Sequence, residues 1–351
     1  MPAIAVADAL RAEGARVSFV GGERAEAELV PAAGYPLDPI RVEGISRSNP
    51  LKALRALAKA GLALGSAGRI LRAREADAVL GGGGYVAGPV GLAALLRRVP
   101  LVLTEADSHI GLSNRLLASR AWRVCLAFPI AGRQGERYLV TGRPVPPRAA
   151  ERGPARAALG IGADELCVLV FGGSLGARSI NLAAVSGFAD APYRVLHIAG
   201  RRDFGELRAP GLHYDLRDYV VPFGQALAAA DLAVARAGGS IFELAQHGLP
   251  AVLVPYPHAT ADHQTANARW MQDGGAAVAI ADAELTAERL RAAVDAILLD
   301  PARLAGMAAA SAGLARPDAA RDVARVVLAA AQGGRGPAGR RSRPGRGRAT
   351  A

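Results

Sequence analysis

The segment 236–267 constrains the fold of this chain most, because a Gly-rich turn, a helix, a buried strand and a polar loop follow one another in it without interruption. The turn AGGS at 237–240 can leave backbone N–H groups free at a helix start, where they attract a phosphate. The run AVLVPY at 251–256 reads as a strand. Polar residues follow it, at the edge where open parallel α/β sheets bind ligands, and they are His258, Asp262, His263, Gln264 and Asn267.

Glu243 has two interpretations. It lies within one helical turn of the Gly-rich turn, where its carboxylate can accept hydrogen bonds from ribose hydroxyls. Ser240 and Glu243 also have the spacing of a capping box, in which the two side chains satisfy backbone donors at a helix start. A carboxylate folded back on the N-cap is poorly placed for ribose, so the two roles compete.

A second Gly-rich turn lies upstream, in CVLVFGGSLGARSIN at 167–181, where an apolar strand runs into three glycines before a helix begins. Such turns permit close backbone approach to a phosphate, although many strand-to-helix turns are Gly-rich for packing alone. Two such turns in one half of the chain favour nucleotide binding there.

Strand-like runs alternate with helical patterns along most of the chain, which predicts an α/β fold with a doubly wound parallel sheet in each half. The expected strands are 17–20, 78–80, 100–103, 124–128, 166–171, 194–198, 219–221, 232–235 and 251–255. The stiff segment TGRPVPP at 141–147 marks a domain junction. We expect one domain at 1–143, a second at 148–331, and a disordered Arg/Gly-rich tail at 332–351.

The composition fits two domains. The chain has 351 residues, of which 51% are hydrophobic, enough for two cores. Cys125 and Cys167 lie in apolar runs without metal-ligand spacing, so we interpret them as buried thiols. We expect no signal peptide at the start of the chain. The uncharged run 78–96 contains six glycines and a proline, which favours a strand, a turn and a helix over a membrane span.

The net charge of +11 is divided between two regions. Six arginines lie in the tail, which can bind nucleic acid or an anionic membrane without specificity. We favour the membrane, or no function at all, over nucleic acid, and expect no specific nucleic-acid partner. The predicted helix 51–74 combines leucines with six basic residues and no acidic residue. Such helices lie well on anionic lipid, although a core-packing helix with a basic face has the same composition.

Together these segments closely resemble the MurG family, which transfers N-acetylglucosamine from UDP-N-acetylglucosamine to undecaprenyl-pyrophosphoryl-N-acetylmuramyl pentapeptide (lipid I), giving lipid II in peptidoglycan synthesis. The matching motifs are PAIAVADAL (2–10), GGGGYVAGP (81–89), GLSNRLLA (111–118), GRPVP (142–146), GGSLGARSIN (172–181), RAGGSIFEL (236–244) and DHQTANA (262–268). The resemblance implies two Rossmann-like domains of the GT-B type with an interdomain cleft. It also implies a peripheral location on the cytoplasmic face of the bacterial cell membrane, whose inner leaflet is anionic.

The resemblance also implies roles for individual residues. In the second domain, Ser174 would face the diphosphate and Asn181 would lie in the same glycine loop. The backbone of Val220 would contact uracil, and Gln264 would reach the sugar hydroxyls. The ribose and uridine side would be lined by Arg236, Ser240, Ile241, Phe242, Glu243 and Leu244. On the acceptor side the catalytic candidates are Tyr85, Glu105 and Asn114, with Asp107 as a substrate-binding residue.

The chemistry implied is direct displacement at the anomeric carbon by the acceptor's C4 hydroxyl, with inversion. It requires a base for that hydroxyl and donors or cations for the departing UDP. No carboxylate pair suited to a metal follows a strand, so we expect helix N-termini and loop amides to take the leaving-group charge. We therefore predict that neither a metal nor another cofactor is needed.

The chain departs from the family pattern at three places. The family carries a strand and a Gly-rich loop with a histidine before PAIAVADAL, whereas Met1 falls where that loop would end. We expect the first domain to lack a central strand and a candidate base, and the chain as written to transfer little, the base then being sought among Glu105, Asp107 and His109. The family's His-Glu-Gln-Asn segment is TEAD at 104–107 here, and Pro146 replaces a usual arginine, with Arg148 nearby.

Two other classes of function remain open from the sequence. Another UDP-sugar transferase or a UDP-N-acetylglucosamine epimerase would share the nucleotide site and differ in the acceptor half. A non-catalytic UDP-sugar-binding protein would keep the site without turnover. Product analysis separates the two enzymes, and turnover separates both from the third class.

Overall fold

A computed structural model describes residues 2–23, 25–40, 42, 50–148, 150–173 and 175–333, with the side chains of 25, 50–60 and 260 excepted. The described chain forms two compact units. The N-terminal unit contains Pro2–Ala106, Ile110–Gly142 and 318–333, and the C-terminal unit contains Asp107–His109 and Arg143–Pro317. Ser174 and nearly all of the expected tail lie outside the described residues.

The C-terminal unit is built on one parallel sheet of six strands in the order β12-β11-β10-β7-β8-β9. Its strands are β7 (Cys167–Phe171), β8 (Arg194–Ile198), β9 (Tyr214–Arg217), β10 (Leu232–Ala235), β11 (Ala251–Leu253) and β12 (Ala277–Ala279). The central strands β7 and β10 are apolar and buried throughout, as expected for a parallel sheet covered on both faces.

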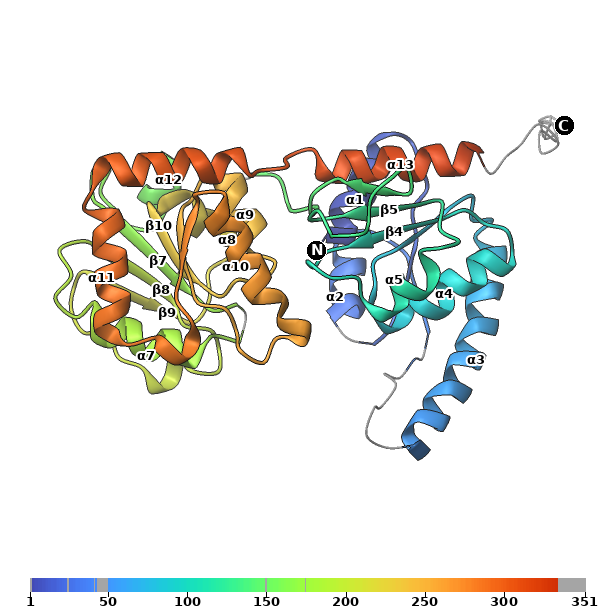
Figure 1. The fold of residues 1–351 in the computed structure, drawn as a ribbon, viewed down its shortest axis with the longest axis horizontal. Coiled ribbons are helices and arrows are strands. Elements are labelled where there is room, and N and C mark those ends of the chain that lie inside the picture. The colour runs from blue at the N-terminus through green and yellow to red at the C-terminus, as the bar shows by residue number, and fades with distance from the viewer. Residues whose placement is uncertain are drawn as a thin grey trace, which may run out of the picture. The chain divides into compact units, whose positions relative to one another are not determined.

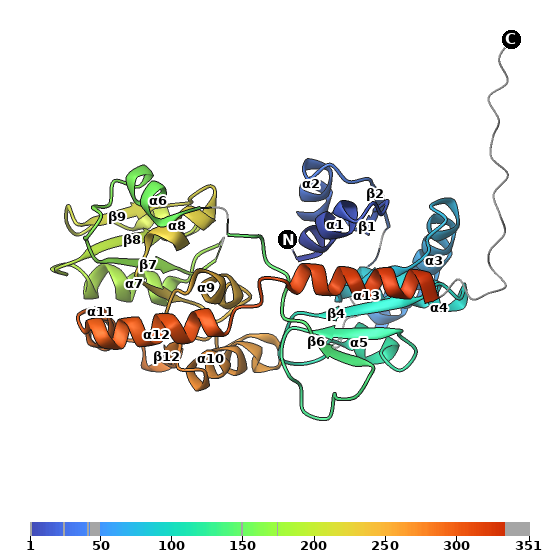
Figure 2. The same cartoon turned by 90° about the horizontal axis from the view of Figure 1, so that it is seen from above.

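Helices cover both faces of this sheet. They are α6 (Arg152–Ala158), α7 (Arg178–Gly187), α8 (Phe223–Ala229), α9 (Ile241–His247), α10 (His263–Asp273), α11 (Ala287–Leu298) and α12 (Pro301–Gly313). Val170 and Val234 point to the face packed by α7 and α11. Phe171 points to the opposite face, where its ring meets Phe223 of α8 at 5.1 Å between centroids. Figure 2 shows α7 and α8 on opposite sides of the sheet.

The N-terminal unit contains two separate parallel sheets. The larger consists of β3 (Val79–Gly81), β4 (Leu101–Glu105), β5 (Arg123–Leu126) and β6 (Tyr138–Val140), and the smaller pairs β1 (Phe19–Gly21) with β2 (Leu37–Pro39). The helices are α1 (Pro2–Ala12), α2 (Ala25–Ala32), α3 (Pro50–Ala73), α4 (Gly84–Leu96), α5 (Leu112–Leu117) and α13 (Ala319–Gly333). The parallel strands expected for this half are therefore confirmed, but among the described residues they form two sheets and not one, because no described strand pairs with both β1 and β3.

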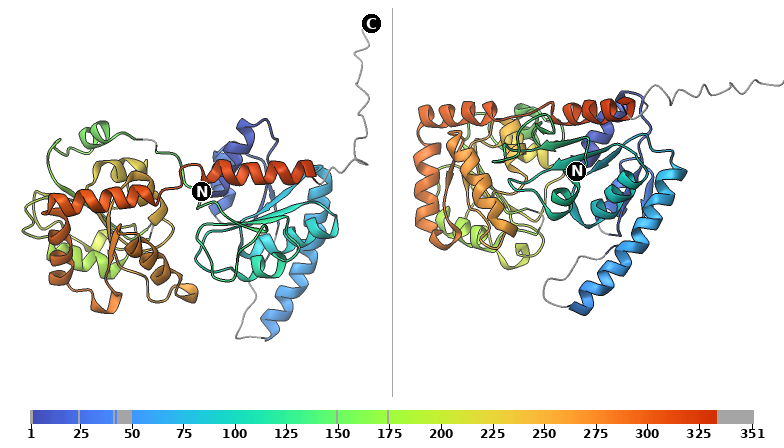
Figure 3. Two further views of the ribbon diagram at one scale, coloured as in Figure 1. Left: turned by 45° about the horizontal axis from the view of Figure 1, so that its top comes forward. Right: turned by 45° about the vertical axis from the view of Figure 1, so that its right-hand side comes forward.

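The last helix corrects the expected domain boundaries. Residues 148–331 were expected to form one domain, yet α13 belongs to the N-terminal unit. Its side chains Val323 and Val327 pack with Val6 and Leu10 of α1, and Figures 1 and 3 show α13 running beside that helix. An amphipathic helix requires an apolar partner, but its own periodicity does not say which unit provides one.

The expected secondary structure is largely confirmed. Strands β8 and β10 have the predicted ends, and the predicted helix 51–74 is α3. The predicted strand 219–221 is wrong, because the edge strand β9 lies earlier, where Tyr214–Arg217 pair with β8. The sequence analysis missed β2, β6 and β12, which have three residues each, too few for a periodic pattern.

Two further expectations are tested by the structure. Cys125 and Cys167 are buried free thiols, as predicted, and burial raises the pKa of each to about 12. The run 78–96 is a strand, a turn and a helix, as expected. Within the described ranges, no helix combines the length and apolarity needed to cross a bilayer.

The turn after β7 generates a stability prediction. Gly176 has φ +83°, and a Cβ there would lie 2.0 Å from the Ala199 carbonyl oxygen. We expect Gly176→Ala to lower the free energy of unfolding by at least about 2 kcal/mol, because an L residue is strained at this φ and the Ala199 backbone cannot yield freely. Gly224→Ala in α8, where a Cβ meets nothing within 4 Å, is the matched control and should be neutral or stabilising. Equal urea midpoints for the two variants would contradict the prediction.

Candidate functional site

Two Gly-rich turns lie next to each other at the carboxyl edge of the C-terminal sheet. One follows β7 and the other follows β10, and these strands are hydrogen-bonded neighbours that pair Phe171 with Ala235. From β7 the chain proceeds to β8 on one side, whereas from β10 it proceeds to β11 on the other. Strand order therefore reverses between them. In open α/β sheets this reversal opens a ligand crevice at the carboxyl ends of the strands.

The β7 turn is held in a tight conformation. A Cβ at Gly172 would lie 2.3 Å from the Ala177 backbone nitrogen, and Gly173 has φ +87°. Only glycine fits these requirements. At these two positions the turn therefore brings backbone rather than side chains to the sheet edge.

Asn181 is buried and holds this turn in place. Its Nδ2 donates to the Ala199 carbonyl oxygen at 3.0 Å and to Asp203 Oδ2 at 2.9 Å, and its Oδ1 lies 3.0 Å from His197 Nε2. Because Oδ1 accepts, Nε2 of His197 carries the proton, and Nδ1 accepts from the Tyr214 hydroxyl at 2.7 Å. Both ends of the Asn181 amide are thus used inside the protein. We interpret Asn181 as a positioning residue rather than a ligand contact.

Arg236, at the start of the β10 turn, is also engaged by the protein. Its Nη1 donates to the carbonyl oxygens of Val254 and Pro255 and to Asp282 Oδ1, the last at 2.5 Å. Its Nη2 donates to Ser179 Oγ at 2.8 Å. The side chain is only 13% exposed. Arg236 therefore fastens the β10 turn to the end of β11, and its predicted contact with ligand remains only a prediction.

The capping role considered for Glu243 is absent. Ser240 has helical backbone angles and makes no side-chain capping bond. Glu243 is partly buried, burial raises the pKa of its carboxyl, and the Arg143 guanidinium opposes that rise. The carboxylate is therefore not folded back on the helix start. This arrangement favours the other interpretation of Glu243, an acceptor for ligand hydroxyls.

Two polar side chains of α10 lie against the β10 turn. Asn267, whose role the sequence analysis did not assign, is buried and donates from Nδ2 to the Ala237 carbonyl oxygen at 2.9 Å. Gln264 accepts from the Tyr256 backbone N–H at 3.0 Å, and its Nε2 lies 3.9 Å from the position of a Cβ on Gly238. The structure thus brings Gln264 and the Gly-rich turn together, as the motifs predicted.

Four expected site residues are core residues. Ile241 and Leu244 are completely buried, and Phe242 and Val220 are 5% and 6% exposed. The Phe242 ring lies 5.4 Å from that of Trp270. Their side chains therefore stabilise the unit, and only their backbone groups are candidates for ligand contact.

The acceptor-side candidates of the N-terminal unit gather at the end of β4. The Glu105 carboxylate accepts from Ala106 N at 3.1 Å, Gly111 N at 2.8 Å and Asn114 Nδ2 at 3.0 Å. It is 8% exposed. Because both oxygens hold the 106–111 loop, Glu105 is a poor candidate for a free general base and a good one for positioning.

Asn114 and Tyr85 differ in how far their side chains are buried. Asn114 is buried, yet its Oδ1 has no hydrogen-bond partner. Tyr85 is 60% exposed in the first turn of α4. The Ser113 hydroxyl donates to the Gly84 carbonyl oxygen at 2.8 Å and joins the start of α4 to α5. The 81–85 turn and Asn114 therefore belong to one local cluster.

Asp107 and His109 group with the C-terminal unit rather than with Glu105. The His109 ring stacks 6.1 Å from that of His263, and its Nδ1 is buried without a hydrogen-bond partner. Asp107 interacts electrostatically with Arg143.

Arg143 is the residue that the sequence analysis overlooked. A Cβ on Gly239 would lie 2.5 Å from its Cζ, so the guanidinium rests directly on the β10 turn. Burial lowers the pKa of Arg143, while Asp107 and Glu243 act in the opposite direction. The signal available in the sequence was an arginine within the GRPVP motif, which we had interpreted only as a junction.

Comparison with protein families identifies the class of enzyme to which the chain belongs. The model described as Glycosyltransferase family 28 N-terminal domain matches residues 1–126, and the Glycosyltransferase family 28 C-terminal domain matches residues 167–323. The chain is thus a glycosyltransferase of family 28, with parallel sheets in both units.

Similar proteins identify the family within this class. A UDP-N-acetylglucosamine--N-acetylmuramyl-(pentapeptide) pyrophosphoryl-undecaprenol N-acetylglucosamine transferase from Moorella thermoacetica is 40% identical, covering 95% of this chain and 96% of that protein. The enzyme of that name from Alkalilimnicola ehrlichii is 43% identical, covering 93% and 94%. The chain belongs to the MurG family.

Solved structures agree with this assignment. MurG from Acinetobacter baumannii superimposes with a TM-score of 0.76 at 30% identity, covering 93% of this chain and 95% of that one. A UDP-GlcNAc 2-epimerase from Neisseria meningitidis has a TM-score of 0.65 but 13% identity, over 93% and 95% of the two chains. The second likeness concerns the fold alone.

The buried histidine generates a pH prediction. Burial lowers the pKa of His197 to about 4, so the folded chain holds it neutral, whereas its ordinary value is 6.5. Neutral His197 stabilises the fold above pH 6.5, and this contribution, roughly 3 kcal/mol, is lost as the pH falls toward 4. We expect His197→Gln to remove that part of the pH dependence of unfolding, and His213→Gln to retain it. An identical pH profile for His197→Gln and the parent chain would disprove the assignment.

Proposed function

We propose that this chain transfers N-acetylglucosamine from UDP-N-acetylglucosamine to lipid I and forms lipid II for peptidoglycan synthesis, at the low rate expected from its departures from the family pattern. The observation that carries the proposal is the pair of Gly-rich turns at the strand-order reversal, with Glu243 not used as a cap beside them. The names of the similar transferases support the same donor and acceptor.

The donor fits the C-terminal unit group by group. The diphosphate takes the backbone of the two turns, where glycine permits close approach. The Glu243 carboxylate accepts from the ribose hydroxyls, Gln264 bonds the sugar hydroxyls, and the backbone at Val220 meets uracil. Asn181 and Arg236 hold the turns in place, and their direct contact with the ligand stays a prediction.

The reaction is an inverting displacement. The acceptor's C4 oxygen forms a bond to the anomeric carbon, the bond from that carbon to the phosphate oxygen breaks, and UDP departs with the electron pair. The hydroxyl proton passes to a base. His109 is a better candidate than Glu105, because its Nδ1 has no hydrogen-bond partner whereas the Glu105 oxygens already accept from backbone donors. Independence of a metal stays a prediction.

Glu243 tests the function directly. We expect Glu243→Ala to weaken UDP-N-acetylglucosamine binding by roughly 1.5–3 kcal/mol, because charge-assisted bonds to ribose are lost. Calorimetry on the full chain measures the affinity, and mass spectrometry of a lipid I analogue measures transfer. Glu151→Ala, an exposed glutamate that makes no capping bond, is the control. Release of an epimerised sugar, or unchanged affinity in Glu243→Ala, would count against the proposal.

The second part of the proposal concerns location. We propose that the chain lies peripherally on the anionic cytoplasmic face of the cell membrane, through the surface formed by α3 and α4. Leu62, Leu92 and Leu96 are 76%, 42% and 68% exposed on these helices. Exposed leucines beside basic residues are typical of surfaces that enter the headgroup region of a bilayer.

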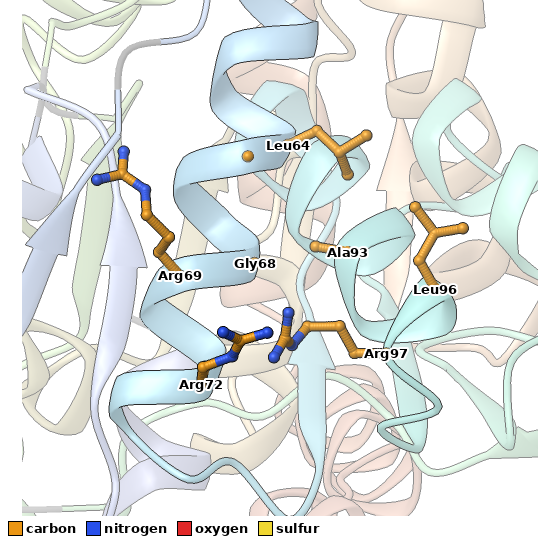
Figure 4. Close-up of a pocket in the computed structure, with 8 residues that line it drawn as sticks. Leu64, Gly68, Arg69, Arg72, Ala93, Leu96 and Arg97 are labelled. Carbon is orange, nitrogen blue, oxygen red and sulfur yellow. The ribbon is translucent and has the colours of Figure 1, made fainter.

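A groove of about 270 Å³ between the two helices collects the positive charge. Arg69, Arg72 and Arg97 line it, and Gly65 and Gly68 leave room on the α3 side. Figure 4 shows the guanidinium groups of Arg72 and Arg97 pointing toward each other. No acidic partner among the described residues accompanies these three arginines. Like charges held together in this way favour an anionic phosphate between them.

Vesicle binding tests the location. We expect Arg72→Glu combined with Arg97→Glu to reduce sedimentation with phosphatidylglycerol vesicles at least about tenfold, since each basic group near an anionic surface contributes about 1 kcal/mol. Arg16→Glu with Arg120→Glu makes the same change of charge on exposed residues elsewhere in the unit. A loss seen only after deletion of residues 334–351 would show that the groove is not the membrane contact.

A further inference from the structure

Arg143 occupies an unusual position for a linker residue. Its Cζ, Nη2 and Nη1 would lie 2.5, 2.6 and 2.7 Å from a Cβ on Gly239. No side chain larger than hydrogen fits at 239 while the guanidinium stays there. The absence of a side chain at Gly239 therefore leaves room for the Arg143 guanidinium beside the backbone of the β10 turn.

The electrostatics of this position show why the cation stays charged. Removing a guanidinium from water disfavours its charged form, and burial accordingly lowers the pKa of Arg143. Asp107 and Glu243 counteract that effect. The protein thus keeps a charged guanidinium against the turn that, under the proposed function, meets the diphosphate.

Arg236, the other arginine of this turn, is held by the protein. The Arg236 guanidinium already donates to two carbonyl oxygens, Ser179 and Asp282. Pro146 stands where the family pattern has an arginine, and its carbonyl oxygen accepts from Gln246 Nε2 at 3.1 Å, beside α9. Arg143 lies three residues earlier on the same stretch of chain.

We propose that Arg143 binds the diphosphate of the nucleotide sugar and supplies, three residues earlier, the cation that the family pattern has at 146. This inference rests on the proposed function and names one further residue of its donor site. As the bond from the anomeric carbon to the phosphate oxygen breaks, the electron pair passes to that oxygen. The guanidinium, held on Gly239, stabilises the added negative charge of the departing UDP.

Comparing UDP with uridine isolates the contact with phosphate. In calorimetric titrations of the full chain, Arg143→Gln should weaken UDP about 10-fold to 100-fold while changing uridine less than about twofold. The UDP affinity of Arg143→Lys should lie between those of the parent chain and Arg143→Gln, because lysine keeps the charge and loses the planar fork of the guanidinium. Arg148→Gln, an exposed linker arginine, is the matched control and should leave both affinities unchanged.

Rescue provides an independent readout. Adding Pro146→Arg to Arg143→Gln should restore part of the lost UDP affinity. If Arg143→Gln loses affinity for UDP and uridine equally, the proposal is overturned and Arg143 is only a structural partner of Glu243. The same comparison in Arg143→Lys decides the matter if Arg143→Gln does not fold. Unchanged UDP affinity would overturn it as well. A parent chain that binds UDP but forms no lipid II would refute the proposed transfer and leave the Arg143 assignment standing.

Discussion

The pairing of β7 with β10 is the interaction on which the site depends. Because these two strands are neighbours and their connections proceed in opposite directions, both Gly-rich turns emerge at one edge of the sheet. Neither turn would form a ligand crevice alone. The rest of the C-terminal unit maintains this juxtaposition through apolar packing on both faces and through polar side chains that fix the turns from behind.

Those polar side chains show that several motif residues bond to the protein itself. Asn181, Arg236 and Asn267 each donate at least one hydrogen bond to a backbone carbonyl of the turns or of an adjacent segment. Such a bond satisfies a buried donor and also fixes a piece of main chain. Glu105 acts in the same way in the N-terminal unit. The motifs thus encode the shape of the site as much as its contacts.

The sequence was sufficient for the fold class, the buried central strands and the Gly-rich turns, because periodicity and turn chemistry are local signals. It was insufficient wherever a residue's role depends on distant partners. The choice between cap and acceptor at Glu243 depended on the backbone angles of Ser240, and the importance of Arg143 depended on Gly239, far along the chain. The three-residue strands were too short to show a period, and the partner of α13 lay at the opposite end of the sequence.

The return of α13 to the N-terminal unit affects the order in which the chain matures during synthesis. Residues 143–317 are contiguous and contain nearly the whole C-terminal unit. In the N-terminal unit, by contrast, Val6 and Leu10 pack against Val323 and Val327, which are synthesised near the end of the chain. Domains generally fold as units as they emerge from the ribosome, the earlier one first. Here the unit that is translated first is the one completed last. Until α13 emerges, α1 has only part of its apolar packing, from the sheet residues Val102 and Cys125.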